Sequence, residues 1–445
     1  MSDLTQNMVE TMLKGNEKQE ARSETAKHLI KNYYFATFRD TEEIYHYREG
    51  YYNNGGDRYI REYVRVLWGN ACTTQDINEI KKAHIMPLTY IDRKDFNADI
   101  NTICLENGIL NLQTIELEEH NPEHKFTFQL PINWNPDAVC PQIDEFLHTT
   151  LDPDDIPIFW QLAGYCLWRN YPIHKAFMLT GDGSNGKSTL INLMKAYLGE
   201  ENICSKSLHS IVYDKFSSAV LYGKHANLYA DLSDQALKQT GMFKLLTGAD
   251  SVDGEKKFKD SFTFKNYAKF IFSANKLPEV YDTTSAFFRR WIIINFPNTF
   301  DDDTADKNLI EKLTTPEELS GMLCKAVKAL QTLLADGKFH NSKTTDEIED
   351  RYIKLSNSVA AFVKDVLTED NEAKPIGRGQ LYSVYTNYCR TNDLIIKSQT
   401  MFTRTLKEFI SVSESRHGNE RVWKGISVKN ELYQSSEDKY GDIGG

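Results

Sequence analysis

Apolar and polar positions divide the chain into three blocks with different patterns. Residues 1 to about 135 alternate short aromatic runs with polar turns, which is typical of an α+β module. Asn107-Gly108 in ICLENGILNL predicts a two-residue hairpin turn, and Arg48-Glu49 is the predicted turn between IYHY and GYY. We therefore expect residues 1–135 to form an N-terminal α+β module that contains β-hairpins.

The second block, residues 136–345, carries four apolar runs that predict β-strands. Helical or mixed segments separate these runs, which are KAFMLT, HANLYA, YAKFIFSA and WIIINF. Strands that alternate with helices favour an α/β fold with a largely parallel sheet. This block is the predicted core of the protein.

The third block, residues 346–430, begins with the helical stretch SNSVAAFVKDVLTE and a Pro-Gly loop. LYSVYTNYCRTND and QTMFTRTLKEFI follow, and the block ends with the strand-like ERVWKGISVK. Helices followed by a terminal pair of strands predict a winged helix. Residues 372–429 hold ten Lys or Arg against five Asp or Glu, which fits contact with DNA. Residues 431–445 are polar and glycine-rich and are expected to form a flexible tail.

A phosphate-binding motif follows the first apolar run of the core. GDGSNGKS matches G-x-x-x-x-G-K-[ST], with a predicted strand before it and a predicted helix after it. Glycines let backbone N–H groups turn toward phosphate oxygens, and the helix N-terminus adds its positive dipole end. Lys187 is predicted to reach the β and γ phosphates of ATP, and the Ser188 hydroxyl to bind Mg²⁺. The predicted nucleotide-binding residues are Gly181, Asp182, Gly183, Ser184, Asn185, Gly186, Lys187, Ser188 and Thr189.

Apolar residues at helical spacing continue the motif up to Gly199, which predicts the end of the helix. These residues are Leu190, Ile191, Met194, Tyr197 and Leu198. A glycine-rich turn with a purely structural role is the alternative interpretation of the motif.

ATP hydrolysis also needs an acid at the end of a neighbouring strand to hold Mg²⁺ and its water. Asp231, at the end of HANLYAD, is the candidate. Leu232 stands where a second acid usually follows, so Asp231 itself, Asp234 or an acid elsewhere remains open as the general base. The alternative interpretation of Asp231 is a helix cap.

Three further residues complete the predicted catalytic set of Lys187, Asp231, Asn275, Arg289 and Arg290. Asn275 lies at the tip of YAKFIFSAN, where its amide can orient the attacking water; a simple turn asparagine is the alternative. Arg289 and Arg290 precede the last strand, and a guanidinium group binds phosphate in a bidentate manner. In a ring, such an arginine comes from the neighbouring subunit. We prefer Arg290 as this arginine finger, while the other arginine pairs with a core carboxylate.

A basic segment, GEKKFKDSFTFKNYAK, lies between the predicted metal-binding acid and the strand that ends at Asn275. Lysines neutralise phosphates and an aromatic ring stacks on a base, so the segment is predicted to be a hairpin that binds single-stranded DNA. A solvated charged turn is the alternative. The predicted DNA-binding residues are Lys256, Lys257, Phe258 and Lys259.

Composition limits the remaining choices. The net charge of −11 argues against a protein that coats nucleic acid with its whole surface. The seven cysteines are scattered, without a C-x-x-C pair, and are interpreted as reduced core residues rather than a disulfide framework or a zinc site. No run approaches the length of a membrane span, and the N-terminus lacks a signal-peptide pattern. We therefore expect a cytoplasmic protein without a membrane partner.

The motifs together resemble the superfamily-3 helicases of poxvirus, phage and plasmid primase-helicases. The resemblance rests on GDGSNGKST, LLTGADSVDGEKKFK and FSANKLPEVYDTTSAFFRRWIIINFP, over about residues 136–300. It extends to LENGILNL and NWNPDAVCPQIDEFL before the core, and to the segment from VAAFVKDVL to VWKGISVK after it. The incomplete acid pair after Asp231 departs from related ring helicases and leaves the base open.

The resemblance implies an AAA+-like P-loop NTPase core with a central parallel sheet. It implies a hexameric ring that translocates 3′ to 5′ on single-stranded and forked DNA, with ATP and Mg²⁺, in the host cytoplasm if a virus or plasmid encodes it. The Walker A lysine corresponds to Lys187, the Walker B acid to Asp231 and the sensor asparagine to Asn275. The only close carboxylate pair, Asp152 and Asp154, lies in a proline turn, so we expect a separate primase or replication partner.

Two other functions compete with a helicase. A nucleotide-switched replication initiator would use the winged helix to recognise an origin without processive unwinding. A small-molecule P-loop kinase would explain the phosphate loop, but not the lysine segment, the paired arginines or the winged helix.

Overall fold

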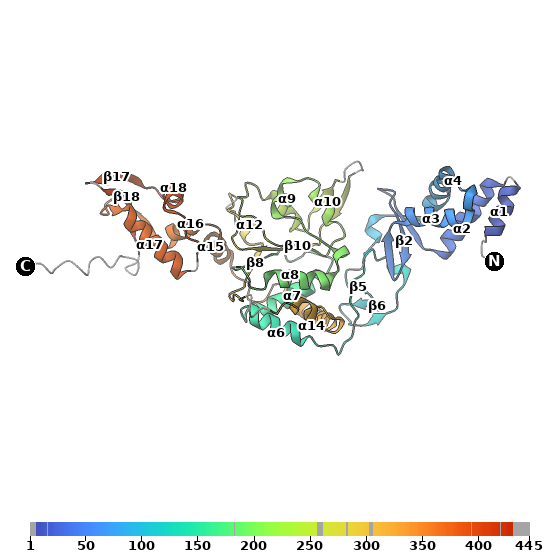
Figure 1. Ribbon diagram of the computed structural model, residues 1–445, viewed down its shortest axis with the longest axis horizontal. Coiled ribbons are helices and arrows are strands. Elements are labelled where there is room, and N and C mark those ends of the chain that lie inside the picture. The colour runs from blue at the N-terminus through green and yellow to red at the C-terminus, as the bar shows by residue number, and fades with distance from the viewer. Residues whose placement is uncertain are drawn as a thin grey trace, which may run out of the picture. The chain divides into compact units, whose positions relative to one another are not determined.

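The computed structural model describes residues 6–15, 17–181, 183–255, 261–281, 284–301, 306–392, 394–418 and 420–429. Asp182, the four predicted DNA-binding residues 256–259 and the predicted tail lie outside these ranges. The chain forms two compact units. Figure 1 labels their helices and strands. The first unit comprises Met1–Asp231, Gly241–Ser273 and Ile292–Ser342. The second comprises Leu232–Thr240, Ala274–Trp291 and Lys343–Gly445.

A five-stranded sheet forms the centre of the first unit, and all four predicted core strands belong to it. The order is β14 (Trp291–Asn295), β8 (Ala176–Thr180), β13 (Lys269–Ala274), β10 (Ala226–Tyr229) and β9 (Ile203–Cys204). β10 pairs in parallel with both β13 and β9. Every residue of β8 and β13 is buried, as expected for strands covered on both faces. The predicted α/β fold with a parallel sheet is confirmed.

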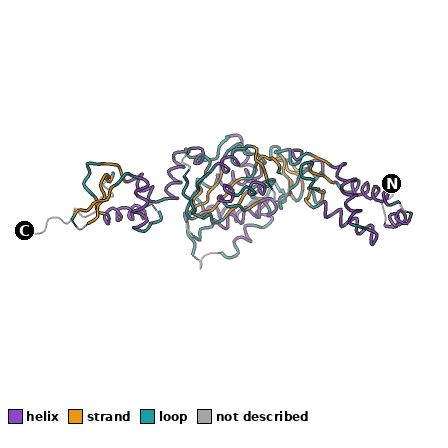
Figure 2. The backbone as a smooth tube through the Cα atoms, turned by 90° about the horizontal axis from the view of Figure 1, so that it is seen from above, coloured by secondary structure: helices purple, strands orange, loops and turns teal. Residues whose placement is uncertain are grey.

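Helices surround this sheet, as the purple coils around the orange strands show (Figure 2). α7 packs against α14 so closely that a Cβ atom at Gly164 would lie 2.2 Å from the Ala326 carbonyl oxygen. The buried Glu318 carboxylate of α14 accepts hydrogen bonds from the backbone N–H groups of Gln142 and Ile143, at 3.1 and 3.0 Å, and so caps α6. The helices of the core are α6 (Pro141–Thr150), α7 (Ile156–Leu167), α8 (Lys187–Leu198), α9 (Leu208–Tyr213), α10 (Ser217–Leu221), α11 (Gly241–Leu246), α13 (Leu309–Leu313) and α14 (Pro316–Asp336).

The N-terminal part of the first unit contains two further sheets, in the orders β3-β2-β1-β4 and β5-β6-β7. The strands are β1 (Phe35–Phe38), β2 (Ile44–Arg48), β3 (Tyr51–Asn54), β4 (Tyr90–Ile91), β5 (Thr102–Leu105), β6 (Gly108–Asn111) and β7 (Leu117–Glu118). The helices are α1 (Gln6–Lys14), α2 (Lys18–Asn32), α3 (Gly56–Trp68), α4 (Thr74–Glu79) and α5 (Met86–Thr89). Helices and strands therefore mix in this region, as the sequence predicts.

Both predicted N-terminal hairpins form, but each turn lies one residue away from its predicted position. Arg48 pairs with Tyr51, so the first turn is Glu49-Gly50, whose φ angles of 57° and 97° suit a two-residue hairpin loop. Leu105 pairs with Gly108, so the second turn is Glu106-Asn107. The Asn107 amide exchanges two hydrogen bonds with the Trp134 backbone, at 2.9 and 3.0 Å. This long-range anchor determines the second turn.

The basic segment is a hairpin in its described part. β11 (Ser251–Gly254) and β12 (Phe262–Lys265) pair antiparallel, from Ser251 opposite Lys265 to Gly254 opposite Phe262. The Ser218 hydroxyl of α10 donates to the Asp253 carbonyl oxygen at 2.9 Å. The predicted hairpin is therefore confirmed in its strands.

The second unit contains the predicted helices and terminal strands of the third block. Its helices are α12 (Ser285–Phe288), α15 (Thr345–Ser356), α16 (Ser358–Val366), α17 (Arg378–Thr391) and α18 (Gln399–Phe409). Its sheet has the order β15 (Leu367–Asp370), β18 (Glu420–Val428), β16 (Ile376–Gly377), and β17 (Ser413–His417) also pairs with β18. Phe362, Tyr385 and Phe402 join α16, α17 and α18 in one buried core.

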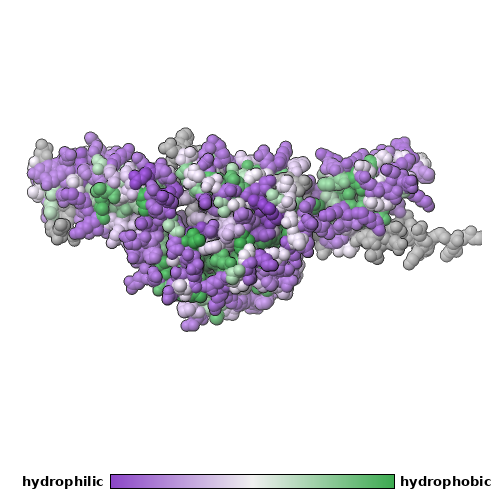
Figure 3. Space-filling model, turned by 180° about the vertical axis from the view of Figure 1, so that it is seen from behind, coloured by the Kyte–Doolittle hydropathy of each residue, from purple (hydrophilic) through white to green (hydrophobic). Residues whose placement is uncertain are grey.

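Hydrophilic side chains cover much of the face drawn in Figure 3, with hydrophobic ones in small patches. Among the described residues, no helix is long and apolar enough to cross a membrane. All seven cysteines have free thiols; six are buried, as the sequence predicts, and Cys72 is half-buried.

Candidate nucleotide-binding site

The predicted phosphate loop connects β8 to α8 in a conformation that only glycine accepts at two positions. Gly181 has a φ of 144°, and a Cβ there would lie 2.6 Å from the Phe296 carbonyl oxygen. Gly186 has a φ of 92°, and a Cβ there would lie 2.9 Å from Thr150 Cγ2. A side chain at either position meets backbone strain and a close neighbour together. By contrast, a Cβ at Gly183 meets nothing within 4 Å.

Lys187 is the first residue of α8 and is only 6% exposed. Its Nζ donates hydrogen bonds to the Gly181 carbonyl oxygen at 2.6 Å and to Asn185 Oδ1 at 2.9 Å. The ammonium group thus lies over the loop, where phosphate oxygens would compete with these two oxygens for it. The phosphate-binding role of Lys187 remains a prediction.

The remaining loop residues differ in exposure. Ser184 has a φ of 55° and is exposed, whereas Asn185 is 3% exposed. Ser188 is exposed in the first turn of α8, and Thr189 beside it is half-buried. The first turn of a helix also has N–H groups without intrahelical partners. The loop therefore presents a hydroxyl and backbone donors next to a buried cation.

The predicted helix after the loop is confirmed from Lys187 to Leu198. All five residues predicted at helical spacing are buried. Gly199 ends the helix with a φ of 83°.

A segment that the sequence analysis did not single out supports the loop from the other side. The Phe300 N–H donates to the Ser184 carbonyl oxygen at 2.8 Å, and Asn185 Nδ2 lies 3.5 Å from the Phe296 carbonyl oxygen. Thr150 and Phe146 of α6 lie against Gly186. These contacts join residues far apart in sequence, so no local pattern points to them.

Asp231 follows β10 by two residues and is exposed. Its φ of 59° is left-handed, an uncommon conformation for a residue other than glycine. No helix begins between Asp231 and Gly241, a stretch that the structure describes in full, so the helix-cap alternative is wrong. In the sheet, β13 alone separates β10 from β8, the strand that leads into the phosphate loop.

Asp234, the other candidate base, belongs to the second unit. Its carboxylate lies 3.0 Å from Lys276 Nζ, and this hydrogen bond lowers its pKa below the ordinary value. A lower pKa weakens a general base at neutral pH. The pairing therefore argues against Asp234 as the base.

Asn275 is exposed in the bend directly after β13 and also belongs to the second unit. The backbone around it is well anchored: the Tyr352 hydroxyl donates to the Pro278 carbonyl oxygen at 3.0 Å. The Leu237 N–H donates to the Glu279 carbonyl oxygen at 2.7 Å. Both the sensor role and the turn role of Asn275 remain predictions.

The two arginines after α12 differ sharply in environment. Arg290 is 7% exposed, and its Nη1 donates to the Ala286 carbonyl oxygen. Arg289 is exposed. Arg289 is therefore the more accessible of the two, and the choice of the arginine finger remains a prediction.

Three family models match the sequence. "D5 N terminal like" matches residues 4–152, and "Poxvirus D5 protein-like" matches residues 354–442. A family of unknown function, DUF5906, matches residues 179–290 between them. The chain resembles the phage- and poxvirus-type primase-helicases. The predicted resemblance is thereby confirmed.

A curated relative agrees. The "Putative helicase L207/L206" of Acanthamoeba polyphaga mimivirus is 25% identical over 334 residues, which are 66% of this chain and 34% of that protein. The match therefore spans about a third of the relative's length.

A solved structure, "The A form apo structure of NrS-1 C terminal region-CTR", shares the fold with a TM-score of 0.52 at 12% identity. The similarity covers 90% of this chain and 97% of that one. A second structure of the NrS-1 C-terminal region, residues 305–718, has a TM-score of 0.48.

Proposed function

We propose that this protein is an ATP-dependent, hexameric DNA helicase of superfamily 3 that translocates 3′ to 5′ on single-stranded DNA. It would serve the replication of a virus, provirus or plasmid. The observation that carries the proposal is the buried Lys187 at the start of α8, with its Nζ over a loop that requires glycine at positions 181 and 186. In this proposal the core is an AAA+-like P-loop NTPase, and residues 346–430 form a winged helix.

The donors around the loop suit the triphosphate of ATP. Backbone N–H groups of the loop and of the first turn of α8 would hold phosphate oxygens, with Lys187 at the β and γ phosphates. Ser188 and Asp231 would hold Mg²⁺, an ion that prefers oxygen ligands. When bound, the ion would supply positive charge to the phosphates during cleavage of ATP.

The remaining roles are assigned by exposure and pairing. Asn275 would orient the attacking water. The ion pair with Lys276 lowers the Asp234 pKa and weakens it as a base, so Asp231 and an acid elsewhere stay open for that role. Arg289 would enter the site of the neighbouring subunit as the arginine finger. Each site in the ring would therefore need two copies of the chain.

DNA would run along the hairpin formed by β11 and β12. The antiparallel pairing of these strands supports a projecting hairpin, and its loop sequence contributes Lys256, Lys257, Phe258 and Lys259. Lysines would contact the strand's phosphates, and the phenylalanine would stack on a base. A primase or another replication protein would act with the ring in the host cytoplasm.

The first experiment measures ATP hydrolysis with and without single-stranded DNA, and unwinding of forks that carry a 3′ or a 5′ loading strand. We expect DNA to stimulate hydrolysis and only the 3′-loaded fork to open. Lys187→Ala removes the phosphate contact, and Lys195→Ala at the far end of the same helix is the matched control. Hydrolysis that ignores DNA, with neither fork opened, contradicts the proposal.

One observation favours a second candidate, the origin-binding initiator. Arg416 and Arg421 lie directly opposite each other in the β17–β18 pair, and both are exposed. Like charges in this arrangement destabilise a hairpin unless an anion such as a DNA phosphate lies between them. Footprinting of the full chain on origin and random DNA distinguishes the two functions. The initiator is supported if the wild type protects one sequence but unwinds no fork. The double variant Arg416→Gln/Arg421→Gln should then lose this protection.

A further inference from the structure

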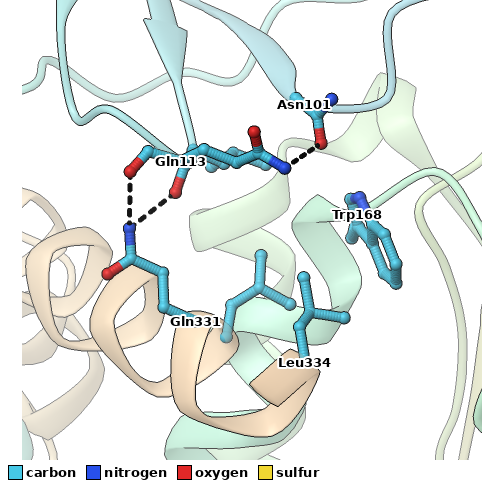
Figure 4. A pocket seen from close by; sticks show the side chains of 7 residues that line it. Asn101, Gln113, Trp168, Gln331 and Leu334 are labelled. Atoms are coloured by element: carbon cyan, nitrogen blue, oxygen red, sulfur yellow. Dashed lines mark hydrogen bonds between the residues drawn. The ribbon is translucent and has the colours of Figure 1, made fainter. Parts of the chain in front are cut away.

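Two cavities of the first unit differ in how their polar groups are used. The smaller, about 300 Å³, lies beside α14, and its amides bond to each other and to the backbone (Figure 4). Gln331 donates to the Leu112 and Gln113 carbonyl oxygens, and Gln113 donates to Asn101 Oδ1 at 3.1 Å. The Gln113 and Gln331 amides therefore already donate to partners within the chain.

The larger cavity, about 400 Å³, lies beside the end of the β11–β12 hairpin where Ser251 pairs with Lys265. It is called here the hairpin-foot pocket. Its volume falls in the range of small-molecule sites, roughly 300–1,000 Å³. Four of its lining residues are cationic, and none of the described lining residues is acidic. The cations are Arg93, Lys94, Arg169 and Lys265. Aromatic rings of Phe96, Tyr222, Phe264 and Tyr267 line the same space.

Arg93 carries a buried donor in this wall. Its side chain is 10% exposed, and its Nε and Nη2 donate to the Asp40 carboxylate at 2.8 and 3.0 Å. Its guanidinium carbon lies 4.2 Å from the Phe38 ring centroid and 4.5 Å from those of Tyr222 and Phe262. A side-chain hydrogen bond with Tyr222 also acts on the Arg93 pKa, so Asp40 and Tyr222 together hold the guanidinium group.

Arg169 and Tyr267 lie in the same wall. The Tyr267 hydroxyl is buried and has no hydrogen-bond partner in the described part of the chain. Arg169 anchors the neighbouring backbone. Its Nη1 donates to the Thr102 carbonyl oxygen at 2.6 Å and its Nη2 to that of Asp99. Arg93 and Arg169 therefore contribute positive charge to the pocket.

Positive charge and aromatic side chains together fit one chemical class. We propose that the hairpin-foot pocket binds a nucleoside phosphate. The base lies against the aromatic side chains that line the cavity. The phosphate stays at the rim beside Lys94 and Lys265, which are exposed. Stacking on aromatic rings beside cations is how proteins bind single strands without sequence preference.

The pocket's position indicates where such a nucleotide comes from. Thr263, Phe264 and Lys265 of β12 and Ser251 of β11 form part of its wall. A strand held by the hairpin would pass this wall, so one of its nucleotides can enter the pocket. This assignment rests on the proposed function, because a free nucleotide shares the same chemistry.

Ala98 at the pocket offers a clean test, since it is exposed and apolar. Ala98→Glu adds a negative charge beside the proposed phosphate, and Ala98→Gln is the matched control of the same shape. We expect fluorescence anisotropy with labelled oligo(dT) to show about tenfold weaker binding for Ala98→Glu and under twofold change for Ala98→Gln. Equal binding by both variants and the wild type overturns the proposal.

Photo-cross-linking identifies the occupant. Oligo(dT) carrying 5-iododeoxyuridine should cross-link to peptides that contain Tyr222, Phe264 or Tyr267, and less so in Ala98→Glu. Free dTMP that blocks the cross-link assigns the pocket to a free nucleotide, whereas a block by longer strands alone assigns it to a bound strand. Cross-links confined to other peptides overturn the proposal.

The outcomes separate this inference from the proposed function. If Ala98→Glu binds DNA as the wild type does and DNA still stimulates hydrolysis, only the assignment of the pocket is contradicted. If Lys187→Ala still hydrolyses ATP, the proposed helicase function is contradicted, even where Ala98→Glu weakens DNA binding.

Discussion

Lys187 in the phosphate loop of the first unit and the Asn275 and Arg289 segments of the second unit differ in how far away along the chain their partners lie. Lys187 bonds to Gly181 and Asn185, six and two residues away, although Phe300 also supports the loop. The segments of the second unit depend on distant partners. Lys397 lies 3.2 Å from the Glu279 carboxylate, and Tyr352 reaches Pro278. The contacts of the lysine are thus local, whereas the other segments depend on the C-terminal block.

This difference has a consequence for coupling. Phe287, Phe288 and Trp291 around the paired arginines all pack against Tyr352 of α15. In the proposed motor, a shift of α15 would therefore be transmitted to the Arg289 segment.

Replacing the paired arginines one at a time tests the comparison most severely. Arg289→Ala should lower the ATP turnover of the assembled protein about a thousandfold, as for other arginine fingers, with an unchanged Tm. Arg290→Ala should mainly lower the Tm, because the side chain is buried. Steady-state hydrolysis and thermal unfolding measure both. A reversed pattern would return the role to Arg290.

Lys187→Ala should lower turnover about a hundredfold or more, because a positioned charge at the phosphates is lost. Its effect should be confined to the loop, so the Tm of the second unit stays unchanged. Lys195→Ala, the control, should keep wild-type turnover. If Lys187→Ala also keeps it, the buried lysine has only a structural role.

The glycines of the loop offer a matched pair. Gly186→Ala places a Cβ at a φ of 92° and 2.9 Å from Thr150, which costs about 1–2 kcal/mol in backbone strain alone. Gly183→Ala meets no neighbour within 4 Å. We expect about tenfold lower ATP affinity for Gly186→Ala and under threefold change for Gly183→Ala, by isothermal titration. Equal effects would show that the steric environment of Gly186 does not matter.

Acid should weaken the first unit through His225. Burial, with Arg169, Lys269 and Lys224 nearby, lowers the His225 pKa to about 3, while its Nδ1 lies 2.8 Å from the Cys166 carbonyl oxygen. The unfolded chain, with a pKa near 6.5, binds this proton first, so stability is present above about pH 6.5 and falls as pH falls. The expected slope is at most about 1.4 kcal/mol per pH unit.

Chemical denaturation at pH 7 and pH 5.5 measures this slope. His225→Asn should flatten it in the first unit. The same slope in both proteins would assign the acid sensitivity to other groups.

The smallest expected effect is in the second unit. Tyr352→Phe removes the hydrogen bond to the Pro278 carbonyl oxygen and leaves that acceptor buried, which should cost about 1 kcal/mol of stability. Tyr382→Phe, whose hydroxyl bonds to the Lys397 carbonyl oxygen in a half-buried position, is the control. A larger loss in the control would contradict the anchoring role of Tyr352.

Local patterns predicted the parts of the fold that depend on local physics. The four buried strands have continuous apolar runs, and the phosphate loop needs its glycines within eight residues, so both are readable in the sequence. The hairpin turns were each misplaced by one residue, because the Asn107–Trp134 contact and the conformations of Glu49 and Gly50 decide them. The difference in exposure between Arg289 and Arg290 could not be predicted from sequence, because two adjacent arginines have the same local pattern.

The central claim is that ATP is cleaved where two copies of the chain meet. Mixing two inactive variants tests this claim most directly. Lys187→Ala and Arg289→Ala protomers are combined with ATP, and native mass spectrometry verifies mixed rings. The account predicts that hydrolysis recovers toward about a quarter of the wild-type rate, because random head-to-tail neighbours restore one interface in four. Mixed rings that stay inactive, or a protein that remains a monomer with ATP, would contradict it.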